Sequence, residues 1–232
     1  MAVYAWPTDR AWWPRGFELR ILPNTRVFVG SYTPTTQVLD MMGERWQGRI
    51  ELSPARNGTE VAAREAFMDR LFGPANQFAI WHFGQPAALG TVGDAPVGVS
   101  VVNASAAAVT VVNASAAVVS VVSGTPVLRY AVPQFAGTAT IQSRPGRTVL
   151  AGSMLGLGGV QTVRVLADAT ADSNGLLVIE FAPRARAAIP AYAAFNTVKP
   201  TINVMLKAAD GVPTTWRADF ADAAAFEFIE VP

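Results

Sequence analysis

The chain has 232 residues and a net charge of +1, from 18 basic and 17 acidic side chains, and its basic residues do not cluster. It therefore lacks the electrostatic footprint of a nucleic-acid-binding protein. Hydrophobic residues make up 51% and charged residues 15%, which predicts a sizeable core and further surface hidden in an oligomer or larger assembly. The absence of cysteine excludes disulfides, thiolate zinc sites and cysteine nucleophiles.

Among the 18 cations, only Lys199 and Lys207 are lysines. Arginine is the cation preferred at protein interfaces, since its planar group pairs bidentately and stacks on aromatic rings. Codon bias in a GC-rich genome explains the same composition equally well. The first residues lack the basic head and long apolar run of a secretion signal, so we expect the chain to stay in the cytoplasm unless a larger assembly carries it out.

The first third of the chain alternates apolar and polar positions between turn signals, which is typical of half-buried strands. The clearest case is 45–52, where Trp46 and Ile50 share one face and Arg45 and Arg49 the other. Strands are predicted over residues 16–22, 25–29, 45–52 and 78–83.

One segment, 59–72, has the pattern of a helix. Thr59 is the expected N-cap, Glu60 lies near the positive end of the helix dipole, and Gly73-Pro74 ends the segment. The predicted apolar stripe consists of Val61, Met68, Leu71 and Phe72.

Residues 99–122 contain two near-identical decapeptides, each built on Val-Val-Asn-Ala-Ser, and the start of a third. Valine, serine and threonine favour extended backbone, and asparagine favours turns, so we expect short strands joined at Asn103 and Asn113 in a structural β-meander. A transmembrane helix and an adhesive surface are the alternatives, but the polar interruptions disfavour a membrane span.

The C-terminal half repeats the strand pattern, and Ser173-Asn174-Gly175 carries a strong hairpin signal. Strands are predicted over residues 127–132, 137–141, 161–166, 176–181, 201–207 and 225–231. The sequence thus predicts a mainly β fold with one substantial α-helix.

No group of residues predicts catalysis, a cofactor or a metal. His82, the only histidine, lies between aromatic residues, where a core position is more common than a catalytic one. Asp168 and Asp172 lack the oxygen density of a calcium loop and predict a turn. The glycine-rich stretch 152–159 lacks the Lys-Ser/Thr ending of a phosphate loop and predicts a tight bend between strands.

The tryptophans are the remaining candidates for a binding surface. We expect Trp12 and Trp13, followed by Pro14, to be the most exposed pair, available for a sugar platform or, more commonly, for interface packing. The candidate interface residues are Trp12, Trp13, Arg45 and Trp46.

Four stretches, taken in order, resemble the distal tail proteins of long, non-contractile-tailed bacteriophages. They are Trp6-Pro7 with Phe17-Glu-Leu; Gly43-Glu-Arg45-Trp46 with Ile50-Glu-Leu52; the predicted helix with Gly73-Pro-Ala-Asn76-Gln-Phe78; and the C-terminal half with Gln161-Thr-Val-Arg164, Glu180-Phe-Ala-Pro183-Arg-Ala-Arg186 and the closing Phe226-Glu-Phe-Ile-Glu230. The repeats 99–122 depart from the family pattern.

This resemblance implies a virion protein of the tail tip that assembles in the host bacterial cytoplasm. It would form a ring with copies of itself, usually a hexamer, and join the tail tube protein to the hub and receptor-binding apparatus. The resemblance implies a β-sandwich carrying one α-helix, which forms the ring, and a second, peripheral domain that is a β-sandwich or barrel-like. The ring-forming β-sandwich would comprise residues 1–92 and 198–232 with the helix at about 60–72, and 93–197, including the repeats, would form the peripheral β-domain. No enzymatic activity, nucleic acid or membrane span is expected.

Two other functions remain open at this point. The first is a carbohydrate-binding module that recognises a host surface glycan through Trp12 and Trp13. The second is a hydrolase built on carboxylates, for which the sequence names no residues.

Overall fold

The computed structural model describes residues 1–29, 36–55, 57–92, 126–207, 216–217, 220–221 and 224–231. The repeats at 99–122 lie outside the described residues, so the structure does not test the predicted meander or its alternatives. Within the described part of the chain, no helix combines the length and apolarity needed to cross a bilayer.

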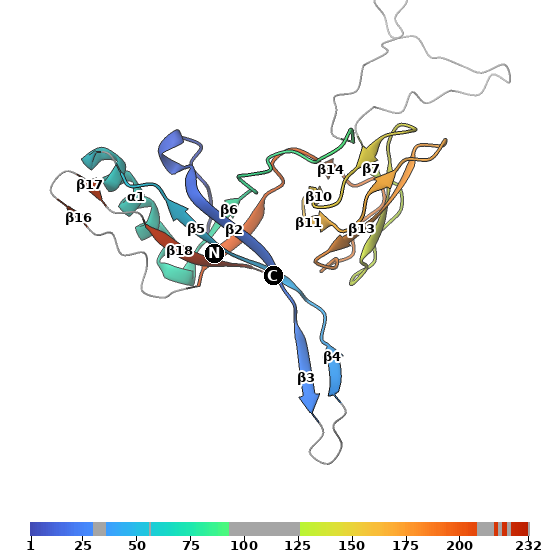
Figure 1. Cartoon of the computed structure of the whole chain (residues 1–232), viewed down its shortest axis with the longest axis horizontal. Helices are drawn as coiled ribbons and strands as arrows, with labels where there is room; N and C mark the ends of the chain where they lie inside the picture. Colours follow the sequence, from blue (N-terminus) through green and yellow to red (C-terminus); the bar gives the residue numbers. More distant parts are fainter. Residues whose placement is uncertain are drawn as a thin grey trace, which may run out of the picture.

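Two six-stranded sheets form the body of the molecule (Figure 1). The first has the order β1-β6-β15-β18-β5-β2 and is antiparallel except for the β1–β6 pair. Chain ends are interleaved here, because β15 and β18 from the C-terminal region lie between β6 and β5. Its strands are β1 (Val3–Ala5), β2 (Pro14–Leu22), β5 (Arg45–Leu52), β6 (Gln77–Ile80), β15 (Ile202–Leu206) and β18 (Ala225–Glu230).

An aromatic core fills this first part of the fold. Trp6 contacts Trp12, Phe67, Phe78 and Phe83 with ring centroids 5.6 to 5.8 Å apart. Such edge-to-face and tilted pairs contribute about 0.5–1.5 kcal/mol each beyond the area they bury. Alternation in β5 directs its side chains as predicted, with Trp46, Ile50 and Leu52 buried and Arg49 exposed.

The predicted helix is present as α1 (Gly58–Leu71), with two differences at its ends. Asn57, not Thr59, is the N-cap, and its side chain accepts a hydrogen bond from the Glu60 N–H at 2.9 Å. At the other end Phe72 adopts a left-handed conformation (φ 46°) and is 75% exposed, so its place in the predicted apolar stripe is wrong. The buried face consists of Val61, Arg64, Phe67 and Leu71.

The second sheet has the order β14-β10-β11-β13-β8-β7 and is antiparallel. A bridge between Val127 and Ala194 brings β7 back beside β14, so the sheet nearly closes into a barrel around its own core. Its strands are β7 (Val127–Leu128), β8 (Thr138–Gln142), β10 (Met154–Leu157), β11 (Gln161–Val165), β13 (Leu176–Ala182) and β14 (Phe195–Asn196). The predicted fold class, mainly β with one helix and a barrel-like second part, is confirmed.

The prediction of a simple bend over the glycine-rich stretch 152–159 is wrong, because this stretch contains the fully buried strand β10. Gly152, Gly158 and Gly159 have positive φ and make the turns on either side of it. Gly156 stays within the strand, where an added Cβ would lie 3.1 Å from the Asn196 side chain. The glycines thus serve the turns and a close approach of β14.

Three small strand pairs complete the described structure beside the large sheets. β9 (Thr148–Val149) pairs with β12 (Ala169–Thr170), and β16 (Trp216–Arg217) pairs with β17 (Phe220–Ala221). A third pair, β3 (Thr25–Val29) with β4 (Thr36–Asp40), forms a hairpin that projects away from both large sheets (Figure 1). The sequence predicted β3 but not β4.

Candidate functional site

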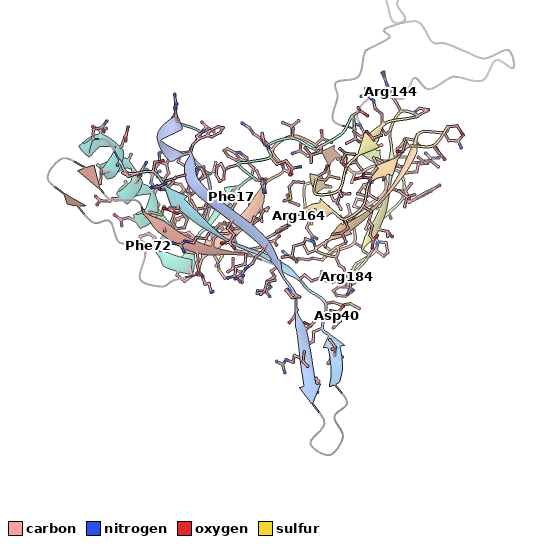
Figure 2. All side chains as sticks on the ribbon, viewed as in Figure 1. Phe17, Asp40, Phe72, Arg144, Arg164 and Arg184 are labelled. Carbon is pink, nitrogen blue, oxygen red and sulfur yellow. The ribbon has the colours of Figure 1, made fainter. Side chains whose placement is uncertain are left out.

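The two sheets meet at a joint centred on Trp46, whose side chain is fully buried. Its indole Nε1–H donates a 2.8 Å hydrogen bond to the carbonyl of Thr162 in β11. The Arg164 guanidinium lies 5.0 Å from the Trp46 ring centroid and donates to the Leu19 carbonyl in β2 at 3.3 Å. Figure 2 shows Arg164 between the two sheets. Burial lowers the pKa of Arg164. The electron-rich face of the Trp46 ring and the Leu19 carbonyl both contact its charged group favourably.

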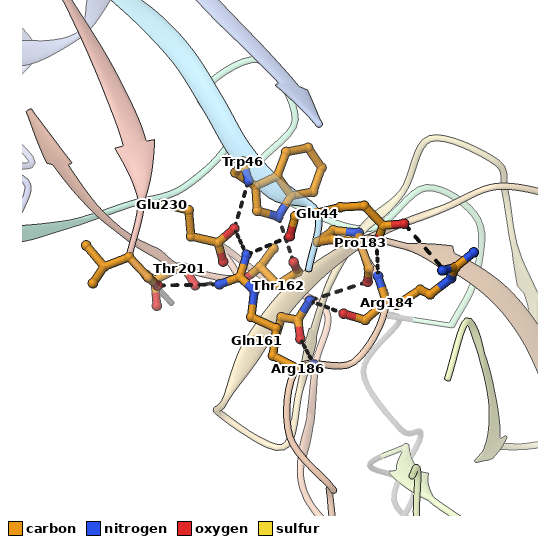
Figure 3. Close-up of polar contacts among 10 residues, drawn as sticks. Glu44, Trp46, Gln161, Thr162, Pro183, Arg184, Arg186, Thr201 and Glu230 are labelled. Carbon is orange, nitrogen blue, oxygen red and sulfur yellow. Dashed lines mark hydrogen bonds and ion pairs between the residues drawn. The ribbon is translucent and has the colours of Figure 1, made fainter. Parts of the chain in front are cut away.

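A buried ion pair lies next to Trp46 (Figure 3). Arg186 Nη2 is 2.5 Å from Glu230 Oε2, and the Trp46 backbone N–H donates to the same oxygen at 2.8 Å. Arg186 also donates to the Glu44 carbonyl at 3.1 Å. Burial raises the pKa of Glu230, while Arg186 and the Trp46 N–H act in the opposite direction. Because Glu230 belongs to β18 and Arg186 follows β13, this pair connects the two sheets.

The loop after β13 is held in place by side-chain bonds to its backbone (Figure 3). Gln161 Nε2 donates to the carbonyls of Pro183 and Arg184 at 3.3 and 3.0 Å, and Gln161 Oε1 accepts from the Arg186 N–H at 3.0 Å. The Glu44 carboxylate accepts from the Arg184 N–H at 2.8 Å. The segment 183–186 is therefore fixed from both sheets.

The same loop reaches the root of the projecting hairpin. Arg184 Nη1 pairs with Asp40 Oδ2 at 2.6 Å, and Figure 2 shows the two residues together where β4 ends. The Met42 N–H, and next Arg184, hold the pKa of Asp40 below its ordinary value. Just before β3, Asn24 Nδ2 donates to the Met42 carbonyl at 2.7 Å. The hairpin thus leaves the body from a hydrogen-bonded base.

Beyond this base the hairpin exposes apolar side chains on both of its faces. Val27 and Val38 lie opposite each other and are 59% and 64% exposed, while Phe28 and Leu39 on the other face are 51% and 52% exposed. A projecting two-stranded ribbon with two apolar faces is marginal by itself and is typical of an interaction surface.

The four predicted interface residues are separated by the fold. Trp12 is 5% exposed and packs against Trp6 and Phe67, so the expectation that it is exposed is wrong. Trp13 is 50% exposed and lines a cleft. Trp46 lies in the joint, and Arg45 beside it is half-buried, with its charge acting to lower the pKa of Glu230.

His82 and Asp172, the sequence candidates for catalysis and calcium binding, make packing and turn contacts in the structure. His82 is half-buried with its ring 5.2 Å from that of Phe17, and burial, followed by the charge of Arg164, lowers its pKa. Asp172 accepts from the N–H groups of Asn174 and Leu176, both at 2.8 Å, and so supports the predicted turn at Ser173-Asn174-Gly175. The turn predicted over 168–172 is wrong, because Ala169–Thr170 form strand β12. No cluster of three potential metal ligands occurs among the residues that the structure describes.

Sequence reasoning missed the joint because its partners lie far apart in the chain. Trp46 and Thr162 are separated by 116 residues, and Arg186 and Glu230 by 44. The available signal was Glu230, an acidic residue at a position that alternation in 225–231 assigns to the buried face with Phe226 and Phe228.

A scan of the chain against family models finds no match, and neither does a search of the curated proteins.

Proposed function

We propose that this chain is a structural protein of a bacteriophage tail tip, where it forms a ring that joins the tail tube to the hub and receptor-binding apparatus. The role is one of assembly, and it requires surfaces that bind neighbouring subunits rather than a catalytic centre. The projecting hairpin β3–β4 is the observation that carries the proposal.

The hairpin is suited to reach a neighbouring subunit. Its apolar side chains Val27, Phe28, Val38 and Leu39 are each at least half exposed. If a neighbouring subunit covered the exposed part of each side chain, the contact would contribute roughly 1 kcal/mol per side chain. A ring closes when each subunit offers one patch to the next and accepts the same patch on another side. An arm that leaves the body and exposes both faces meets the first half of that requirement.

The joint supports the proposal because a ring subunit must hold a fixed shape. Trp46, Arg164 and the Arg186–Glu230 pair connect the sheets through hydrogen bonds and an ion pair. Arg184 extends the same network to Asp40 at the hairpin root. The direction of the arm is therefore coupled to the arrangement of the two sheets.

The first test is the mass of the purified chain by size-exclusion chromatography with light scattering, together with negative-stain microscopy. We expect rings or a multiple of the 24.5 kDa chain. Val27→Asp combined with Val38→Asp should reduce the assembly to monomers, since it places charges on one face of the arm. Val178→Asp is the matched control, because Val178 is equally exposed (61%) but lies on β13.

A chain that stays monomeric at high concentration, or a hairpin variant that assembles as well as the control, would contradict the proposed role of the arm. The tail-tip assignment has a separate test in gene order. We expect a gene of tape-measure length upstream and a hub gene downstream, and a coding region without tail genes would contradict it.

A further inference from the structure

A cleft of about 510 Å³ opens between the start of β2, the segment after β5 and the first turn of α1. Its lining consists of Arg10, Trp13, Pro14, Ser53, Pro54, Glu60 and Arg64. The volume lies within the range of about 300–1,000 Å³ that is common for small-ligand sites. The hairpin and the joint contribute no residue to this lining.

The outer wall of the cleft is the indole of Trp13. The preceding residue, Trp12, is buried in the aromatic core and receives the Trp6 Nε1–H on its carbonyl at 3.2 Å. The Trp13 N–H donates to the Arg10 carbonyl, and its indole Nε1–H donates to the Thr8 carbonyl with Nε1 and the oxygen 3.4 Å apart. Because Trp12 is anchored in the core, Trp13 is held outside the core with half of its surface exposed to solvent.

The inner wall is the buried guanidinium of Arg64. This side chain projects from α1, is only 7% exposed, and donates from Nη1 to the Ser53 carbonyl at 2.6 Å. A cation that is more than nine-tenths buried is rare unless other groups compensate for its lost hydration. Glu60, one turn earlier on the helix, is near enough for its charge to favour the charged form of Arg64.

The charges of the lining define the class of ligand. Arg10 and Arg64 bring two positive charges and Glu60 one negative charge, so the described side chains leave a net charge of +1. A net positive charge favours an anionic ligand, and guanidinium groups pair well with a carboxylate. An aromatic face beside arginine and carboxylate groups suits a sugar ring, which stacks on one side and offers hydroxyls at its edge.

From this geometry we infer that the cleft binds an acidic saccharide, with a sugar ring on Trp13 and its carboxylate at Arg10 and Arg64. The site is distinct from the arm that carries the proposed assembly. Binding and assembly are therefore separable properties of one chain.

The experiment is a screen of the full chain against an array of neutral and acidic bacterial glycans, followed by calorimetric titration of the glycans that bind. We expect acidic glycans to bind and their neutral counterparts to bind at least tenfold more weakly. Trp13→Ala should weaken binding about tenfold, since an aromatic stack contributes about 1.4 kcal/mol. Arg10→Ala should weaken binding and reduce its salt dependence.

Phe72→Ala is the matched control, because it removes an exposed aromatic side chain that does not line the cleft. Circular dichroism and light scattering of each variant check fold and assembly. The inference is overturned if no glycan binds, if neutral glycans bind equally well, or if Trp13→Ala binds like the control. It is also overturned if an oligoglutamate peptide or a nucleoside monophosphate binds more tightly than any glycan. A chain that assembles but binds no glycan overturns this inference alone and leaves the proposed function intact.

Discussion

The ion pair in the joint predicts that its two partners have unequal effects when each is removed. Glu230 is the more deeply buried, with 6% of its side chain exposed against 18% for Arg186. Arg186→Met leaves a carboxylate buried without its cation, a change that destabilises proteins by about 3–5 kcal/mol. Glu230→Gln removes the buried negative charge, and the new amide oxygen can still accept from the Trp46 N–H. We expect that variant to lose about 1–2 kcal/mol.

The raised pKa of Glu230 supplies the sign of the pH effect. Burial makes the folded protein hold this proton to a higher pH than the unfolded chain does, so the Arg186→Met variant should regain stability as the pH falls toward 5. At neutral pH its buried carboxylate is charged without a cation, or must take up a proton. In both cases the free energy of unfolding that Arg186→Met loses relative to wild type is largest at high pH.

The assay is urea unfolding of the wild type, both single variants and the double variant at pH 5 and pH 8. Because the joint connects two cores, unfolding should be followed both by tryptophan fluorescence and by far-UV circular dichroism. We expect the two probes to coincide in the wild type and to separate in Arg186→Met. The double variant should be more stable than Arg186→Met alone. If Glu230→Gln costs as much as Arg186→Met, or if the loss does not change with pH, the reasoning is refuted.

Three further predictions test local features. Gly48→Ala should destabilise by about 3 kcal/mol or prevent folding, because its Cβ would lie 2.1 Å from the Glu18 carbonyl oxygen, whereas Gly58→Ala has no atom within 4 Å and should be neutral or stabilising in the same denaturation assay. Equal effects of the two changes would contradict the packing of β5. Phe72→Gly should stabilise by about 1 kcal/mol, since Phe72 is exposed and left-handed, and a loss in melting temperature would contradict this. The lowered pKa of His82 means that below its ordinary value of 6.5 the unfolded chain binds more protons than the folded one, so stability should fall from pH 7 to pH 5. His82→Asn should flatten that slope, and an unchanged slope would show that His82 does not contribute to it.

Much of the first sheet could be predicted because its signals are local. Alternation in 45–52 correctly predicts the burial of Trp46, Ile50 and Leu52, although Gln47 on the other face is buried as well. Gly73-Pro74 marks the end of α1. Errors arose where two local signals compete. Asn57 and Thr59 are both good caps, and only the backbone geometry selects Asn57.

Long-range contacts decided the rest. Trp12 and Trp13 are identical and adjacent, yet the position of Phe67 on α1 buries one and leaves the other at a cleft. The glycines within 152–159 indicate turns, but pairing with β11 and β14 makes residues 154–157 the strand β10.

The sequence by itself determined a mainly β chain with one helix, few charges and an excess of arginine over lysine. Only the tertiary structure decided that arginines 164, 184 and 186 join two sheets and the root of a projecting arm. The physical reason is that periodicity reports burial along one segment. A buried charge, by contrast, is stable only beside partners that the folded chain brings to it from other elements.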